Sequence, residues 1–329
     1  MAQHEKITMA QAFNHALRDA MTDDESVLMF GEDVGALGGV FRVTDGLSAE
    51  FGDSRCFDTP LAESGIMGMA VGLAMNGMRP VVEMQFDAFA YPAFEQLVSH
   101  VAKMRNRTRG AVNLPITIRI PYAGGIGGVE HHCDSSEAYY VHTPGLTVVA
   151  PATVADAYTL MREAIASPDP VVVLEPKKLY WSKEEVDLDE AQPGIGRAVV
   201  RREGTDATLI AYGTSVPTAL EAADAAAAEG RSLQVVDVRS LVPFDDETVC
   251  GAVRSTGRAV VVAESAGFAS VASEIVARVT ERCFHHLAAP VRRVTGFDIP
   301  YPPPKLEHLH LPSVDRILDA VDTLQWEDV

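Results

Sequence analysis

The sequence predicts an α/β protein of two domains, each with a mainly parallel β-sheet flanked by helices. Short runs rich in valine and isoleucine alternate with helical stretches in the first half of the chain, which is typical of a parallel sheet covered on both faces. This alternation stops in a charged segment after about residue 176 and begins again near residue 206. A length of 329 residues is sufficient for two cores of ordinary size.

In the first half, an apolar face formed by Ala10, Phe13, Leu17 and Ala20 predicts a helix over residues 8–21. The predicted strands that follow cover residues 26–30, 80–84, 116–120, 146–149 and 171–174. The predicted helices between these strands cover residues 63–77, 91–107 and 153–166.

An acidic run over residues 184–190, followed by Pro193 and Gly194, has the composition of an exposed linker. Beyond it, predicted strands cover residues 207–212, 233–238 and 259–263. Predicted helices cover residues 216–229, 245–255, 268–283 and 313–324. We therefore predict a first domain over residues 1–180, a linker over 181–205 and a second domain over 206–329.

The composition excludes several classes of function. A net charge of -19 is the wrong sign for binding nucleic acid or an anionic membrane surface. No apolar run approaches the roughly 18 to 20 residues that span a bilayer, and the N-terminus resembles neither a signal peptide nor a transit peptide. The four cysteines lack the paired spacing of a zinc ribbon and fit free thiols. We expect a cytoplasmic protein.

Residues 58–72 contain an acidic residue at the start of a predicted helix that has three glycines on one face. The glycines are Gly65, Gly68 and Gly72. Each costs up to about 1 kcal/mol relative to alanine, and close packing at a subunit interface would explain them. Glu63 stands at the head of this helix, after the extended entry that Pro60 enforces. It could stabilise the helix dipole or take part in chemistry, and the residues alone leave both interpretations open.

Two further stretches follow predicted strands, where open α/β sheets bind ligands. Residues 82–92 run from a strand into Phe86, Phe89 and Tyr91, which could equally be core residues. Glu32, with Asp33, follows the first strand and could belong to a site or simply form a turn.

A third stretch, residues 124–135, is rich in glycine and contains His131 and His132. No Gly-Lys-Ser/Thr follows the glycines, so the stretch is not a phosphate-binding loop. Two histidines beside Cys133 and Asp134 suggest a metal, but neighbouring side chains diverge and no fourth ligand has a usual spacing. We predict no metal here and favour a histidine that handles a proton or holds substrate.

Across nearly its whole length the chain resembles the beta subunit of the thiamine-diphosphate-dependent 2-oxoacid dehydrogenases, in which this component decarboxylates the 2-oxoacid. The matching segments keep the family's order. They are residues 30–34, 38–42, 57–63, 118–119, 132–137, 144–146, 175–177, 210–213, 236–239 and 256–258. The resemblance implies a transketolase-type pyrimidine-binding domain followed by a transketolase C-terminal domain.

The resemblance assigns roles to several residues. Glu63 matches the glutamate that donates a hydrogen bond to the aminopyrimidine ring of the cofactor and so favours loss of the thiazolium proton. Gln85 and Phe89 match positions that line the pyrimidine, and Leu61 matches one that offers a backbone carbonyl. Glu32 lies where the family has an acid close to the cofactor.

His132 matches the family histidine implicated in acyl transfer to the lipoyl group. Cys133 stands where relatives usually have serine, and His131 precedes the match. A shift of one residue in this loop would make His131 the functional histidine.

The family's signature for Mg²⁺ and diphosphate, Gly-Asp-Gly with a later asparagine, does not occur in the sequence. In two-chain members the alpha subunit carries it. The resemblance therefore implies an alpha2beta2 heterotetramer in which this chain holds the pyrimidine end of thiamine diphosphate, the alpha subunit holds Mg²⁺, and a lipoyl acyltransferase receives the acyl group. Some relatives bind a monovalent cation near the strand with Thr117, but we do not predict one.

Residues 39–42 and 175–180 look closer to members that act on branched-chain 2-oxoacids, such as 3-methyl-2-oxobutanoate. A pyruvate or acetoin dehydrogenase beta subunit is the alternative. A split transketolase-like enzyme would share the pyrimidine domain, and a non-catalytic docking scaffold would share only the fold.

Overall fold

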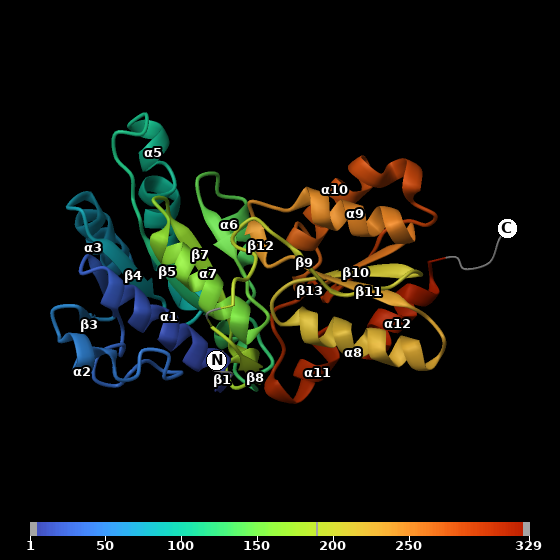
Figure 1. The fold of residues 1–329 in the computed structure, drawn as a ribbon, viewed down its shortest axis with the longest axis horizontal. Helices are drawn as coiled ribbons and strands as arrows, with labels where there is room; N and C mark the ends of the chain where they lie inside the picture. Colours follow the sequence, from blue (N-terminus) through green and yellow to red (C-terminus); the bar gives the residue numbers. More distant parts are fainter. Residues whose placement is uncertain (1–4, 189, 325–329) are drawn as a thin grey trace. The chain divides into compact units, whose positions relative to one another are not determined.

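A computed structural model describes residues 5–188 and 190–324, and in it the chain divides into two α/β units (Figure 1). One unit combines residues 1–122 with 139–195, and the other combines residues 123–138 with 196–329. Both are built on mainly parallel sheets flanked by helices, which confirms the predicted fold class. The sequence places residues 123–138 within the first domain, whereas in the structure they cluster with the second unit.

The strands of the first unit lie in the order β6-β7-β5-β4-β2-β3, and each neighbouring pair is parallel. Their bounds are β2 Val27–Gly31, β3 Cys56–Asp58, β4 Arg79–Glu83, β5 Thr117–Tyr122, β6 Thr147–Val149 and β7 Val171–Pro176. The five strands predicted for this half are confirmed. The short β3 shows no pattern of its own in the sequence and is recognisable only by its pairing with β2.

The helices of this half are α1 Met9–Asp23, α2 Leu47–Phe51, α3 Glu63–Met75, α4 Tyr91–Gln96, α5 Met104–Arg107, α6 Glu137–Val141 and α7 Val154–Ala166. The continuous helix predicted over residues 91–107 is wrong in one respect. A π-helical segment over Leu97–Val101 follows α4 and interrupts the regular helix before α5, because its wider turn changes the hydrogen-bond step.

Helices α1 and α7 pack together on one face of the first sheet. Their apolar side chains meet alternate strand residues such as Val27 and Met29, as the two-residue period of a strand requires. Helix α1 begins at Thr8, whose side chain accepts a hydrogen bond from the Gln11 N–H at 3.1 Å while the Gln11 side chain accepts one from the Thr8 N–H at 2.9 Å. This reciprocal cap fixes the start of the helix.

The predicted linker over residues 181–205 is partly strand. β8, Lys183–Val186, pairs antiparallel with β1, Glu5–Thr8, and β9, Val199–Arg202, joins the second sheet. Although β8 is mostly charged, its exposure alternates along the strand. Lys183 and Glu185 are exposed, whereas Val186 is buried. An acidic run therefore forms one strand of a two-stranded ribbon.

The second unit contains a five-stranded sheet in the order β14-β13-β10-β11-β9, in which only β9 is antiparallel. The further bounds are β10 Ala207–Ala211, β11 Leu233–Asp237, β12 Ser240–Val242, β13 Ala259–Ala266 and β14 Arg292–Gly296. The helices are α8 Ser215–Ala228, α9 Asp246–Thr256, α10 Val271–Cys283, α11 Glu307–His310 and α12 Val314–Asp322. Figure 1 shows α9 and α10 on one face of this sheet and α8 and α12 on the other. None of the helices within the described residues has the length and apolar character that crossing a membrane requires.

A buried ionic cluster lies inside the first sheet. Arg119 on β5 is fully buried and donates to Glu175 on β7 through two nitrogens, at 2.6 and 2.8 Å. A third nitrogen donates to Glu83 on β4. Burial alone lowers the pKa of an arginine, but the carboxylates of Glu175 and Glu83 outweigh burial and raise the pKa of Arg119 above its usual value. The cluster therefore joins three adjacent strands through charged groups.

Arg119→Met should destabilise the chain by about 3–5 kcal/mol, because it leaves Glu175 and Glu83 buried without a counter-charge. The matched control is Arg105→Met, which breaks the exposed 2.6 Å pair with Asp169 and should cost about 1 kcal/mol or less. Urea denaturation of the two variants measures the difference. Equal losses of stability would show that the cluster does not support the sheet.

Candidate active site

Three of the sequence-predicted site residues lie at one edge of the first sheet. Glu32 directly follows β2, Glu63 begins α3 after β3, and Gln85 follows β4. The parallel register sets Gly31 beside Asp58 of β3 and Glu83 of β4. The carboxyl ends of the three strands therefore meet, and the residues that follow them share this edge, where ligands bind in open α/β sheets.

The turn after β2 is held tightly against its neighbours. A Cβ on Gly31 would stand 2.8 Å from the backbone oxygen of Glu83, so no larger residue fits. The Gly35 N–H donates to Asp58 Oδ1 at 2.7 Å, and the Gly39 N–H donates to the Asp33 carbonyl at 2.8 Å. These bonds fix the backbone that carries Glu32.

Glu32 is a buried carboxyl group in an acidic environment. Its Oε1 has no hydrogen-bond partner among the described residues. Burial, followed by the nearby carboxylates of Glu63, Asp33 and Glu83, raises the pKa of Glu32 to about 7. A carboxyl group with this pKa can hold or release a proton near neutral pH.

Glu63 is 8% exposed and is the first residue of α3. The residue before it, Ala62, has no polar side chain with which to cap the helix. The Glu63 carboxylate accepts no hydrogen bond from the part of the chain that the structure describes, and its charge contributes to the raised pKa of Glu32. The two carboxyl groups are therefore close enough to interact.

The amide and aromatic candidates lie just beyond β4. Gln85 Nε2 donates to Asp33 Oδ2 at 2.9 Å, which links the turns after β4 and β2. Phe89 is half-buried and contacts buried Phe86 edge to face, with ring centroids 5.5 Å apart. Phe86 is thus a core residue, as one alternative for this stretch held, whereas part of Phe89 remains accessible.

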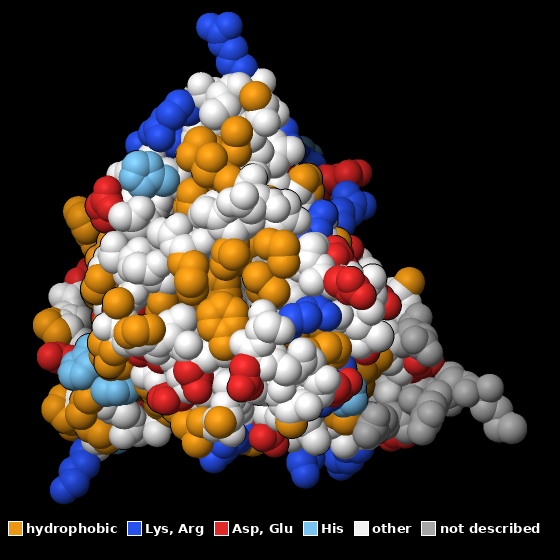
Figure 2. All heavy atoms as spheres, turned by 90° about the vertical axis from the view of Figure 1, so that its left-hand side faces the viewer, with side chains coloured by type: hydrophobic (Ala, Val, Ile, Leu, Met, Phe, Trp, Pro, Cys, Tyr) orange, Lys and Arg blue, Asp and Glu red, His pale blue; other side chains and the backbone are white. Residues whose placement is uncertain are grey.

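Leu61 and the glycine face of α3 are exposed. Leu61 is 79% exposed, and a Cβ added to Gly68 or Gly72 would meet no atom within 4 Å among the described residues. Met69 and Met75 are exposed on the same helix. Figure 2 shows hydrophobic side chains gathered in the middle of the face on which α3 lies. A helix that is apolar on all sides and has only glycines on one face is suited to contact with another chain.

The histidine loop, residues 123–138, belongs to the second unit. The Ala123 N–H donates to the Asp134 carbonyl at 2.8 Å and closes the loop. His131 is exposed and His132 is half-buried, with their ring centroids 4.6 Å apart. Among the described residues, no group of histidine, cysteine and acidic side chains is arranged to hold a metal ion.

No role was predicted from the sequence for three buried residues whose ion pairs join the strands beside this edge. They are Glu83, Arg119 and Glu175. Tyr180 joins them by donating to Glu175 Oε2 at 2.6 Å. Burial, followed by the charge of Glu175, raises the pKa of Tyr180. The signal in the sequence was a charged residue within an otherwise apolar strand, at Arg119 and again at Glu175.

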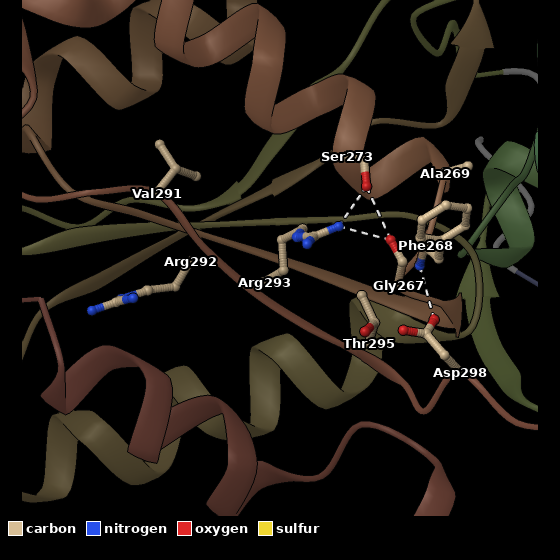
Figure 3. Close-up of a pocket in the computed structure, with 9 residues that line it drawn as sticks. All are labelled: Gly267, Phe268, Ala269, Ser273, Val291, Arg292, Arg293, Thr295 and Asp298. Carbon is tan, nitrogen blue, oxygen red and sulfur yellow. Dashed lines mark hydrogen bonds between the residues drawn. The ribbon is translucent and has the colours of Figure 1, made fainter.

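A groove of about 540 Å³ lies beside β13 and β14 in the second unit (Figure 3). Arg293 there donates to the Gly267 carbonyl at 2.7 Å and to Ser273, and Asp298 accepts from the Phe268 N–H at 2.9 Å. Because β14 is an edge strand, charged residues on it discourage pairing with another sheet. We assign the groove no part in the chemistry.

Comparison with known proteins finds two domains that follow one another along the chain. Residues 5–182 match the transketolase pyrimidine binding domain, and residues 196–317 match the transketolase C-terminal domain. The 3-methyl-2-oxobutanoate dehydrogenase subunit beta of Mycobacterium tuberculosis is 56% identical over 97% of this chain and 92% of its own length. The pyruvate dehydrogenase E1 component subunit beta of Leifsonia xyli is 55% identical over 97% of this chain and 94% of its own length.

Among solved structures, an inactive beta4 tetramer of a split gene transketolase is similar with a TM-score of 0.79 and 25% identity, covering 97% of this chain and 98% of the other. The two matched domains span both units, and the curated relatives match almost end to end. The chain belongs to the family of beta subunits of the thiamine-diphosphate-dependent 2-oxoacid dehydrogenases.

Proposed function

We propose that this chain is the beta subunit of a branched-chain 2-oxoacid dehydrogenase, with 3-methyl-2-oxobutanoate as substrate, and that Glu63 activates its thiamine diphosphate. The observation that carries the proposal is the pair of interacting carboxyl groups, Glu32 and Glu63, at the carboxyl edge of a pyrimidine-binding domain. The choice of substrate is supported by the resemblance of residues 39–42 and 175–180 to branched-chain members. The relatives at 56% and 55% identity carry different substrate names.

The residues at the edge suit the pyrimidine end of the cofactor. They provide two carboxyl groups, one of which has a buried oxygen free for a ligand, together with the amide of Gln85 and the partly accessible ring of Phe89. Leu61 would contribute its backbone carbonyl. When bound, thiamine diphosphate supplies an acidic carbon that, once deprotonated, attacks the keto group of the substrate.

In this mechanism Glu63 holds a proton on its carboxyl group and donates it in a hydrogen bond to a pyrimidine nitrogen. Phe89 offers an aromatic face to a planar ring, and Gln85 fixes its orientation. His132 would give a proton to the sulfur that leaves when the lipoyl disulfide opens and its other sulfur takes up the acyl group.

The proposed partners are an alpha subunit, in an alpha2beta2 heterotetramer, and a lipoyl acyltransferase. The alpha subunit would hold Mg²⁺ and the diphosphate, and the exposed glycine face of α3 provides a surface on which another backbone can approach closely. We also propose a cytoplasmic location, which suits four free cysteines, all buried.

The proposal is tested by co-expressing the chain with candidate alpha subunits and measuring turnover with thiamine diphosphate and Mg²⁺. We expect kcat/KM on 3-methyl-2-oxobutanoate to exceed that on pyruvate by about tenfold or more, since a pocket shaped for two extra methyl groups discriminates on that scale. A preference for pyruvate or acetoin would overturn the substrate. Carbon–carbon bond formation without lipoyl reduction would indicate a split transketolase.

Glu63→Gln in the alpha–beta complex should lower kcat by about 10²- to 10⁴-fold, because an amide cannot exchange the proton that activates the cofactor. Assembly, measured by size-exclusion chromatography, should be unchanged. Glu281→Gln, an exposed glutamate of α10, is the control and should keep full activity. Retained activity in Glu63→Gln would favour a non-catalytic docking scaffold.

Glu32 should make the stability of the isolated chain depend on pH. Its folded pKa of about 7 lies above the unfolded value of 4.5, so its contribution is fully present below about pH 4.5 and is lost as pH rises through 7. Relative to the wild type, Glu32→Gln should therefore gain up to about 2.5 kcal/mol between pH 5 and pH 8. Urea titrations at the two pH values measure this change, and a pH-independent difference would contradict the raised pKa.

A further inference from the structure

The histidine loop is tied to the C-terminal part of the second unit through backbone N–H groups. The Gly124 N–H donates to Glu264 on β13. The Gly125 N–H donates to both the Tyr301 hydroxyl and Glu307 Oε2, each at 3.2 Å, and the Gly127 N–H also donates to Glu307 Oε2 at 3.2 Å. The groups joined are 140 to 182 residues apart in the chain, so only the tertiary fold brings them together.

The hydrogen bonds between the histidine loop and Glu264, Tyr301 and Glu307 form a tether. One carboxylate oxygen is its central acceptor. Glu307 Oε2 accepts from the Gly125 and Gly127 N–H groups and from the Tyr301 hydroxyl, the last at 2.9 Å. Burial raises the pKa of Tyr301 far above its usual value, and the neighbouring Glu307 raises it further, so the hydroxyl keeps the proton that it donates. Hydrogen bonds to a charged acceptor are stronger than neutral ones.

The glycines of the loop are the residues that this tether requires. A Cβ on Gly124 would lie 2.0 Å from the Tyr301 hydroxyl oxygen, so a side chain there would displace the tyrosine. Gly125 and Gly127 have φ angles of +79° and +68°, in the left-handed region that side chains disfavour. The glycine run is thus explained by the close approach of the loop to Tyr301 and Glu307.

The opposite end of the histidine loop is fixed as well. Glu137 accepts a hydrogen bond from the buried Tyr212 hydroxyl at 2.7 Å, and Glu264 is itself held by Thr214 at 2.6 Å. Between these anchors Ile126, Val129 and His131 are exposed. Because this part of the loop buries little surface, its order depends on the anchors rather than on packing.

We propose that Glu307 and Tyr301 are positioning residues for acyl transfer. Through the backbone of Gly125 and Gly127 they hold the histidine loop in the conformation in which His132 meets the lipoyl disulfide. This role rests on the proposed function of His132. Neither residue touches the reacting atoms; each acts by restricting the loop.

The test uses the alpha–beta complex with thiamine diphosphate and Mg²⁺, and it separates the two half-reactions. Decarboxylation is measured with an artificial electron acceptor, and acyl transfer is measured as reductive acylation of a lipoyl domain. In Glu307→Ala, acyl transfer should fall by about 10- to 100-fold, the loss expected for a catalytic group misplaced by about 1 Å. Decarboxylation should stay close to that of the wild type.

Two variants and one control refine the test. Glu307→Gln keeps an acceptor oxygen without the charge and should recover part of the transfer rate, and Tyr301→Phe should lose less than Glu307→Ala because the glycine bonds to Glu307 remain. Glu281→Ala removes an exposed glutamate of the same unit and should change neither half-reaction. Equal losses of decarboxylation and transfer in Glu307→Ala, or no loss in either, would overturn the proposal.

Hydrogen exchange in the complex provides a readout that is independent of activity. Amides 124–128 should exchange faster in Glu307→Ala than in the wild type, with the strands of the second sheet unchanged. If exchange increases while acyl transfer remains normal, the tether exists but does not position a catalytic group, and the proposal is wrong. A wild-type complex that fails to acylate a lipoyl domain refutes the proposed function instead, and exchange still tests the tether.

Discussion

The ionic cluster of Arg119 with Glu175 and Glu83 is the interaction on which the first unit depends most. It places charges inside a buried sheet, and its stability requires that β4, β5 and β7 keep one register. A shift of any strand would leave a buried charge without its partner. The edge that carries Glu32, Glu63 and Gln85 therefore follows strands whose register is fixed. Glu83 connects the ionic cluster to this edge, because its charge also contributes to the raised pKa of Glu32.

In the proposed function, that edge is only part of an active site. Burial and the neighbouring carboxylates raise the pKa of Glu32, which keeps a proton on this acid near neutral pH. Beside it, α3 exposes methionines and bare glycine backbone that a monomer would be expected to bury. The same helix thus begins with the proposed catalytic acid and presents the proposed surface for a partner, so the proposal links assembly and cofactor activation through one element.

The histidine loop shows how a flexible sequence gains a defined position. Four of the five residues from Gly124 to Gly128 are glycines, and such a segment by itself would adopt many conformations. Glu264, Tyr301 and Glu307 supply acceptors for the N–H groups of this segment and so restrict it. The loop follows β5 in the chain but belongs to the second unit, and its order is set by residues near the C-terminus.

The sequence by itself determined the fold class, the regular strands and helices, and the candidate residues, because apolar periodicity and ordered motifs are local properties. It misplaced what depends on distant partners. The acidic run pairs as β8 only because Glu5–Thr8 lies beside it, and the helix over residues 91–107 is interrupted at Leu97–Val101. Only the tertiary structure decided that Arg119 is paired, that Glu32 has a pKa near 7, and that the glycines of the histidine loop fit Tyr301 and Glu307. The physical reason is that burial, charge proximity and backbone contacts arise between residues far apart in the chain.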